Sequence, residues 1–262
     1  MIRQIVGSIG KIFLSLAETF GSYFLMAKSA LFWAICSKPE FSEISKQSVK
    51  IGVDSFLVTA LTSFFTGMVL ALQMGQTTRN LFNEPLYVGT IVAFALVKEL
   101  GPVLTAIVVA GRAGAVVTAE IGTMKVTEQI DALYTLGTNP SRYLIVPRFA
   151  AFLLTLPVLT IFADFIGITG GCLVGASQLS IPSTQYIDDI LSTLNFKDVL
   201  HGYVKTYFFA FMIAMVSCHK GMKTTGGAEG VGKSTTEAVV ISMVLVLVMD
   251  YFVSSMLVAV GL

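Results

Sequence analysis

The sequence predicts an all-α integral membrane protein, with five membrane-spanning helices preceded by an amphipathic segment. Of its 262 residues, 55% are hydrophobic and only 13% are charged, and the mean hydropathy is +0.81. Soluble domains carry about 25% charged residues, so this chain lacks the polar side chains that a water-exposed surface of its size needs. Five apolar runs are long enough to cross a bilayer. These observations exclude an ordinary soluble enzyme and a disordered chain.

The charge balance excludes nucleic acid as a partner. Seventeen Lys and Arg residues stand against 16 Asp and Glu residues, so the net charge is +1 and no basic stripe is available for phosphate contacts. Three cysteines and two histidines lie far apart in the sequence. They predict neither a disulfide framework nor a metal site, and no cofactor is expected.

The first element is an amphipathic segment over residues 12–36. Polar residues Lys11, Ser15, Glu18 and Ser22 recur at spacings of four, three and four residues, which gathers them on one face of a helix. Such a helix can lie in the membrane interface. The segment is also apolar enough to span the bilayer. The residues alone leave both placements open.

Five spans follow in order. They are Ile51–Met74, Leu86–Ala119, Leu144–Leu179, Val199–Cys218 and Ala238–Leu262. A perpendicular span needs about 20 residues, and the second and third are longer. Because these two contain Pro102, Pro147 and Pro157, we expect tilting, kinking or extension beyond the bilayer.

The distribution of Lys and Arg predicts the orientation. Twelve of them lie on the side that holds the N-terminal segment, and only Arg79 and Lys197 lie on the opposite side. Since cytoplasmic loops carry the excess of positive charge, the N-terminus is expected in the cytoplasm and the C-terminus outside. The cytoplasmic stretch 122–147 contains a helical pattern from Thr127 to Leu133, and the outer stretch 180–198 can form a short amphipathic helix.

One motif resembles a nucleotide site without its context. Residues Gly227–Ser234 fit the phosphate-loop pattern G-x-x-x-x-G-K-[ST]. That loop needs a preceding buried strand, whereas here it lies between two membrane spans. We therefore predict a flexible glycine-rich turn, with Ser234, Thr235 or Thr236 capping the last helix.

Small residues recur every four positions in two spans, which allows helices to approach closely in lipid. One row is Gly167, Gly171 and Gly175, and the other is Ala110, Gly114, Thr118 and Gly122. Dimer contact and packing within one chain are both compatible with these rows.

Charged residues within or at the edges of the spans are the candidates for function. They are Asp54, Lys98, Glu99, Arg112, Glu120, Asp164, Lys205 and Asp250. An unpaired charge at mid-bilayer costs at least ~2.5 kcal/mol, so each must face a partner, a cavity or water. Glu99 and Lys205 are candidates for a pair that gates a substrate cavity. The alternative is structural pairing between helices.

The central sequence resembles a known family. It reads Glu99-Leu-Gly-Pro-Val-Leu-Thr-Ala106, then Ala110-Gly-Arg-Ala-Gly114, Ala119-Glu-Ile-Gly-Thr-Met124 and Thr127-Glu-Gln-Ile-Asp-Ala-Leu133, with Glu229-Gly-Val-Gly-Lys-Ser-Thr-Thr236 further on. These motifs resemble the MlaE (YrbE) family of ABC-transporter permeases over about residues 45–262.

The resemblance implies a division of the chain and a set of site residues. Residues 1–45 would be an interfacial helix with its connector, and residues 46–262 a five-span permease domain with an outer-loop helix at about 181–197. The substrate cavity would contain Lys98, Glu99, Lys205 and Asp250. A coupling helix at about 122–136 would meet the ATPase through Thr127, Glu128, Gln129, Ile130 and Asp131.

The resemblance also implies partners and location. The chain would form a homodimer in the bacterial inner membrane with a cytoplasmic MlaF-like ABC ATPase, an outer MlaD-like MCE-domain hexamer and, in some systems, a MlaB-like STAS-domain protein. The assembly would move phospholipids or related lipids between the inner membrane and the MCE protein, which supports outer-membrane lipid asymmetry or lipid supply. ATP would be hydrolysed in the separate subunit, so this chain is not expected to be an enzyme.

Two other functions would fit a multi-span membrane protein. An ion-coupled secondary transporter working without an ATPase would use the intramembrane charges as proton relays. No inverted repeat is apparent, however, and five spans do not divide into halves. An intramembrane lipid enzyme would need a nucleophile or metal motif, and neither H-E-x-x-H nor G-x-S-x-G occurs.

Overall fold

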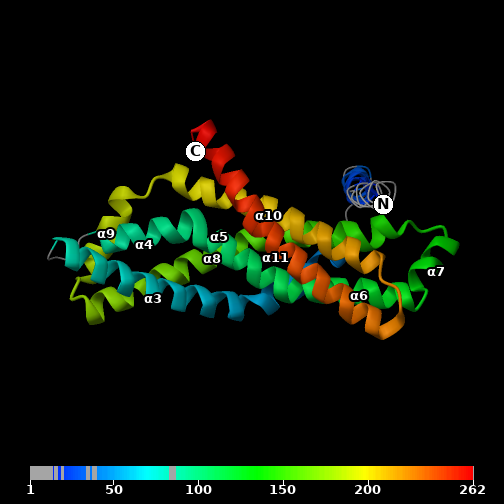
Figure 1. Ribbon diagram of the computed structural model, residues 1–262, viewed down its shortest axis with the longest axis horizontal. Coiled ribbons are helices and arrows are strands. Elements are labelled where there is room, and N and C mark those ends of the chain that lie inside the picture. The colour runs from blue at the N-terminus through cyan, green and yellow to red at the C-terminus, as the bar shows by residue number, and fades with distance from the viewer. Residues whose placement is uncertain are drawn as a thin grey trace, which may run out of the picture.

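The computed structural model describes residues 14, 17–18, 21–33, 36, 40–82 and 87–261. The described residues form helices and no strand. Five of the helices are long and apolar enough to cross a membrane: Phe41–Leu81, Val88–Val126, Ser141–Gln178, Phe196–Met222 and Gly227–Val260. Figure 1 shows that they form one elongated bundle. The predicted all-α membrane fold with five spans is confirmed.

Three of the spans are built from several helical segments. The first contains α2 (Phe41–Ser48), a π-helical turn (Val49–Val53) and α3 (Asp54–Phe82). The second contains α4 (Val88–Ala95), α5 (Gly101–Val109) and α6 (Ala115–Val126), which are joined by π turns at Leu96–Leu100 and Ala110–Gly114. The third contains a π turn (Ser141–Ile145) and α8 (Val146–Gln178).

The last two spans are the unbroken helices α10 (Phe196–Met222) and α11 (Gly227–Val260). Two short helices mark opposite ends of the bundle in Figure 1, α7 (Gln129–Thr135) and α9 (Ser183–Thr193). We refer to these as the α7 end and the α9 end. The described N-terminal residues lie at the α7 end.

Several helices extend beyond the predicted bounds. The first span begins at Phe41 rather than Ile51, so the domain boundary expected at residue 45 falls inside α2. The last span begins at Gly227 rather than Ala238. An apolar run marks only the part of a helix that lies in hydrocarbon, and the polar turns at its ends give no such signal.

The glycine-rich segment is helical, which corrects the prediction of a flexible turn. Residues Gly227–Ser234 form the first turns of α11, and Gly226 precedes them in the left-handed conformation, with φ 90°. Thr235 therefore does not cap the helix, because its hydroxyl donates to the carbonyl of Val231 within it. Glu229 in the first turn favours this start, since a carboxylate is stabilised at a helix N-terminus.

Two of the π turns lie immediately before a proline-containing turn of the helix. The N–H of Gly101 donates to the Leu96 carbonyl just before Pro102, and the N–H of Val146 donates to the Ser141 carbonyl just before Pro147. A proline has no N–H and its ring collides with the carbonyl four residues earlier in an α-helix. The wider turn relieves this conflict, and the predicted kinks become local changes of hydrogen-bond register.

The rows of small residues pack within the chain. A Cβ atom on Gly67 of α3 would overlap the carbonyl of Gly167 in α8, and one on Gly171 would lie 2.6 Å from the Tyr186 hydroxyl of α9. In the second row, the Thr118 hydroxyl lies 3.2 Å from the Ser217 carbonyl of α10, to which it donates. Among the described residues, both rows bring helices of the same chain together.

The N-terminal helix docks against the bundle at the α7 end. Residues 21–33 are helical and are seen nearly end-on in Figure 1, so their axis crosses the long axis of the bundle. The Tyr23 ring lies 3.8 Å from the His219 ring of α10, and the Ser22 hydroxyl lies 2.8 Å from His219 Nε2. This crossing favours the interfacial placement over a sixth span. Lys11 and Ser15 of the predicted polar face lie outside the described residues.

Candidate functional site

A buried lysine joins three spans near the α9 end of the second span. Lys205 of α10 has a fully buried side chain, and its Nζ lies 2.5 Å from Glu99 Oε2 and 3.1 Å from Asp250 Oδ1 of α11. The Ser254 hydroxyl donates to Glu99 Oε1 at 3.4 Å. We call Glu99, Lys205 and Asp250 the Lys205 cluster. The pairing of Glu99 with Lys205 is present, while its role as a gate stays a prediction.

Local backbone geometry brings these side chains together. Glu99 lies in the π turn Leu96–Leu100, where the helix is wider than an α-helix. Gly202 lets α10 approach this turn, because a Cβ atom at residue 202 would overlap the Val97 carbonyl. Lys205 follows Gly202 by three residues and so lies on the same face of α10. Close backbone contact therefore places its amine against Glu99.

Lys98 lies apart from this cluster, although it was expected to share the cavity. Its Nζ is 2.8 Å from Asp198 Oδ1 and 4.7 Å from the centroid of the Phe94 ring. Consecutive residues of a helix point about 100° apart, so Lys98 and its neighbour Glu99 meet different partners. Asp198 also accepts the Asn195 N–H at 3.0 Å, which caps the start of α10.

The Lys205 cluster has an open side. Lys205 is inaccessible, but the side chain of Glu99 is 46% exposed and that of Asp250 is 22% exposed. One cation faces two carboxylates, so the cluster carries an excess of negative charge when both are ionised. Such a group within a membrane span can contact polar groups of a ligand or of another subunit at its open side.

The corner between α6 and α7 contains the five residues expected to couple to an ATPase. Glu128 and Gln129 are exposed, and Glu128 has a left-handed backbone with φ 61°. Asp131 pairs with Lys125 at 3.0 Å, and the Thr127 hydroxyl donates to the Thr123 carbonyl. Ile130 is buried in the core, with 1% of its surface exposed. Its side chain therefore anchors α7 to the core, and the coupling role of the five residues stays a prediction.

The expected coupling helix also has different bounds. Residues 122–126 belong to the end of α6, and only Gln129–Thr135 form α7. Thr127 and Glu128 form the turn between them, and Glu128 starts α7 with its left-handed backbone. The helical pattern from Thr127 to Leu133 begins within two residues of α7, whereas the wider bounds 122–136 follow from the family resemblance.

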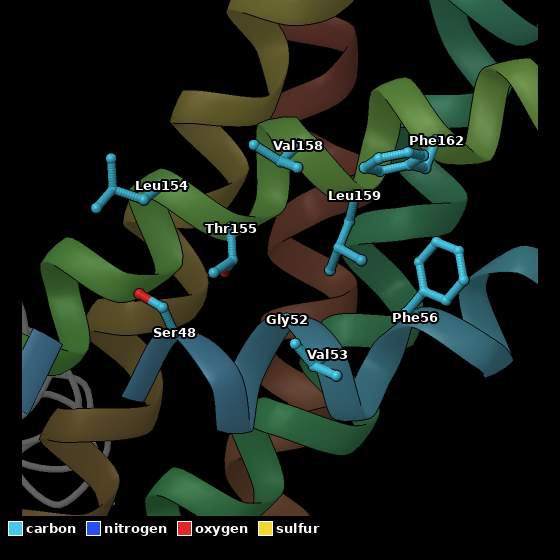
Figure 2. Close-up of a pocket in the computed structure, with 9 residues that line it drawn as sticks. All are labelled: Ser48, Gly52, Val53, Phe56, Leu154, Thr155, Val158, Leu159 and Phe162. Atoms are coloured by element: carbon cyan, nitrogen blue, oxygen red, sulfur yellow. The ribbon is translucent and has the colours of Figure 1, made fainter. Parts of the chain in front are cut away.

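An apolar cavity of about 370 Å³ lies between the first span and α8 (Figure 2). Its polar lining residues are Ser48 and Thr155, and the rings of Phe56 and Phe162 meet edge to face at 5.7 Å beside it. A polar cavity of about 410 Å³ lies nearer the N-terminal helix and is lined by residues that include Trp33, Glu40 and Arg142. Neither cavity contains a residue of the Lys205 cluster.

Two sets of charged partners were missed by sequence reasoning. The sequence places Asp198 in the outer loop, whereas the structure pairs it with Lys98. The sequence places Glu120 at the edge of a span, and the structure shows that it contacts both Lys50 and Arg148. The signal for Asp198 was its place three residues after Asn195, the spacing of a helix-capping pair. Within the described ranges, no group of three or more His, Cys, Asp or Glu residues could hold a metal ion.

Comparison with known proteins gives a consistent result. The family model for Permease MlaE matches residues 44–256. A "Probable ABC transporter permease protein" of Rickettsia felis is 42% identical over 256 residues, which is 98% of each chain. The "Intermembrane phospholipid transport system permease protein MlaE" of Haemophilus influenzae is 35% identical over the full length of both chains. A cyanobacterial relative, from Synechocystis, is 40% identical over 80% of this chain and 79% of its own length.

Proposed function

The chain belongs to the MlaE family of ABC-transporter permeases, and from this premise we propose that it forms the membrane pathway of a transporter that moves phospholipids. The observation that carries the proposal is the Lys205 cluster, a fully buried amine held by carboxylates from two other spans, one of them half exposed. A phospholipid head group carries a phosphate and, in many lipids, an amine. The phosphate can replace a carboxylate as the partner of Lys205, and the amine can replace Lys205 as the partner of a carboxylate. The cluster is therefore a candidate gate of the lipid cavity. Neither the comparisons nor the described residues favour an ion-coupled transporter.

The energy source in this proposal is ATP bound by a separate cytoplasmic ATPase subunit. Its docking surface is the α7 end, where Glu128, Gln129, Tyr134 and Leu136 are exposed. A left-handed backbone at a residue other than glycine is unfavourable by about 1 kcal/mol. A glutamate at this strained position is explained if its carboxylate contacts the ATPase. The chain itself contributes no nucleotide site in this arrangement.

The remaining assembly follows the family resemblance. The chain would form a homodimer in the inner membrane, with an MCE-domain hexamer at the α9 end and, where present, a STAS-domain protein on the ATPase side. Of the twelve Lys and Arg residues that the sequence predicts on the cytoplasmic side, the nine that the structure describes belong to segments toward the α7 end, which supports a cytoplasmic location for that end and for the N-terminus. The C-terminus would then lie outside.

The first test is purification of the complex from its native membrane in mild detergent, with mass spectrometry of co-purifying proteins and lipids. We expect an ABC ATPase, an MCE protein and bound phospholipid. A chain that is reproducibly isolated without an ATPase, in several detergents, would contradict the proposal.

The second test uses the purified complex in proteoliposomes with a fluorescent phospholipid. Glu99→Gln and Lys205→Met should each lower ATP-driven lipid transfer while the complex still assembles. The matched controls are Lys220→Met and Glu237→Gln, since these residues form a 2.7 Å ion pair between the same two helices as Lys205 and Asp250. Wild-type transfer in both cluster variants would leave only a packing role for the cluster.

A further inference from the structure

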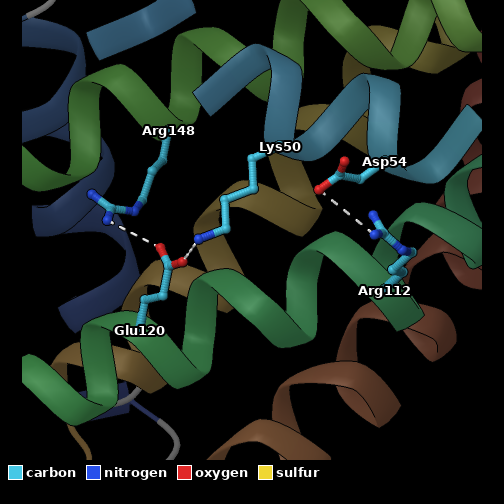
Figure 3. Close-up of polar contacts among 5 residues, drawn as sticks. All are labelled: Lys50, Asp54, Arg112, Glu120 and Arg148. Carbon is cyan, nitrogen blue, oxygen red and sulfur yellow. Dashed lines mark hydrogen bonds and ion pairs between the residues drawn. The ribbon is translucent and has the colours of Figure 1, made fainter. Parts of the chain in front are cut away.

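Three segments of the chain meet at one carboxylate near the α7 end. Lys50 comes from the π turn of the first span, Arg148 from the start of α8, and Glu120 from α6. Figure 3 shows the Glu120 carboxylate between the two cations. Lys50 Nζ contacts Oε1, and Arg148 Nη2 lies 3.4 Å from Oε2. Each oxygen therefore binds a different span.

The burial of the three side chains shows which one is fixed. The Arg148 side chain is only 7% exposed and its Nη1 donates to the Leu144 carbonyl at 2.9 Å, whereas Glu120 and Lys50 are 26% and 46% exposed. Removing one member of a buried ion pair leaves the other uncompensated, which is unfavourable in a membrane. Arg148 thus holds Glu120 on the side of α8, and Lys50 is the more mobile partner.

Glu120 is connected to α7 through the last turns of α6. It is the last charged residue of α6 before Lys125, whose Nζ lies 3.0 and 3.1 Å from the two oxygens of Asp131. The buried Ile130 side chain fixes the same corner to the core. Glu120 lies six positions before the end of α6 at Val126, about 9 Å along the helix. A displacement of α7 therefore moves Glu120 with it.

We infer that Glu120 is a positioning residue, which passes movement of the α6–α7 corner to the first and third spans through its ion pairs with Lys50 and Arg148. This inference rests on the proposed function, because it assumes that an ATPase acts on α7. In the resting arrangement both pairs are formed and the three spans are held together. When α7 is displaced, the carboxylate draws Lys50 and Arg148 with it, and the starts of both spans move in concert.

A second ion pair provides a control between two of the same spans. Asp54 of α3 and Arg112 of the π turn Ala110–Gly114 are 3.7 Å apart, and Arg112 Nη1 donates to the Ser55 hydroxyl at 3.3 Å. This pair joins the first and second spans, as Lys50 and Glu120 do. It does not involve α8, and it lies further from the corner. Loss of this pair should weaken packing without interrupting the transfer of movement.

The experiment measures ATP hydrolysis and lipid transfer in the same proteoliposomes, which contain the whole complex. For Glu120→Gln we expect ATP hydrolysis within about two-fold of wild type, while the lipid moved per ATP falls about ten-fold. For Asp54→Asn both quantities should stay within about two-fold. A merely structural role would lower hydrolysis and transfer together, so their ratio separates the two explanations.

A second variant protects the test against misfolding. Lys50→Met removes the pair with Lys50 and keeps the ion pair between Arg148 and Glu120. It should therefore lower the amount of lipid moved per ATP less than Glu120→Gln does. The inference is overturned if the ratio is unchanged in both variants, or if Asp54→Asn lowers it equally. A wild-type complex that hydrolyses ATP without moving lipid would overturn the proposed function, and this inference with it.

Discussion

Gly202→Ala tests how the close approach of α10 controls the Lys205 cluster. The added Cβ atom would overlap the Val97 carbonyl and lie 3.4 Å from Pro102 Cγ. Because the obstacle is backbone, it cannot rotate away, and α10 must move by roughly 1 Å. The 2.5 Å contact between Lys205 and Glu99 would lengthen to roughly 3.5 Å, the outer limit of a hydrogen bond.

Overpacking of this kind lowers stability by about 1–3 kcal/mol. We expect a lower midpoint of thermal unfolding in detergent. A loss of about 1.4 kcal/mol from the stabilisation by the Lys205–Glu99 pair would lower the rate of lipid transfer about ten-fold. The matched control is Gly232→Ala in α11, where no described atom beyond the chain neighbours and the backbone of the same helix lies within 4 Å of the added Cβ atom. It should gain up to ~1 kcal/mol in helix propensity. A Gly202→Ala complex with wild-type midpoint and transfer would refute the reasoning.

Three further predictions concern the two ends of the bundle. Glu128→Gly should raise the unfolding free energy by about 1 kcal/mol, because glycine adopts the left-handed backbone without strain. The same variant should weaken ATPase binding in a pull-down. Unchanged binding would show that Glu128 is not part of the docking surface. His219→Ala removes the ring that contacts Ser22 and Tyr23, so limited proteolysis should cut the N-terminal helix faster than in Lys197→Ala. Burial raises the pKa of the Tyr186 phenol above its usual value of 10, so the stability that the neutral phenol provides is complete below about pH 10 and is lost as pH rises further. Tyr186→Phe should flatten the fall in unfolding midpoint above pH 10, and an unchanged slope would assign that fall to other groups.

The sequence was sufficient to place the spans and insufficient to pair their charges. Apolar runs located all five spans because hydrophobic length is set by the bilayer. Glu99, Lys205 and Asp250 were recognised because a charge in a span needs a partner. Lys98 was assigned to the same cavity, since its position in the sequence does not reveal the direction of its side chain. That direction depends on the π turn, which forms through packing against Gly202 and the backbone restriction at Pro102.

The same limit applies to the rows of small residues and to the glycine-rich segment. Gly67, which faces Gly167, lies on another span in a further row of small residues, Ser63, Gly67, Ala71 and Gly75, and a row in the sequence does not reveal which helix it faces. The start of α11 at Gly227 could not be predicted from helix propensity, because glycine is unfavourable in helices. Glu229 near the helix N-terminus and the 2.7 Å pair between Lys220 and Glu237 are electrostatic contacts that favour the helix and that glycine propensity does not reveal.

The π turns have a consequence for the phase of the second span. Each one adds a residue to a helical turn, so the segment that follows is rotated by about 100° relative to a continuous α-helix. A single helical wheel drawn over Val88–Val126 therefore mixes faces that do not coincide. The wheel must be restarted after Leu100 and again after Gly114. One rod-like span thus presents three independently oriented faces, and Glu99, Arg112 and Glu120 each meet different neighbours.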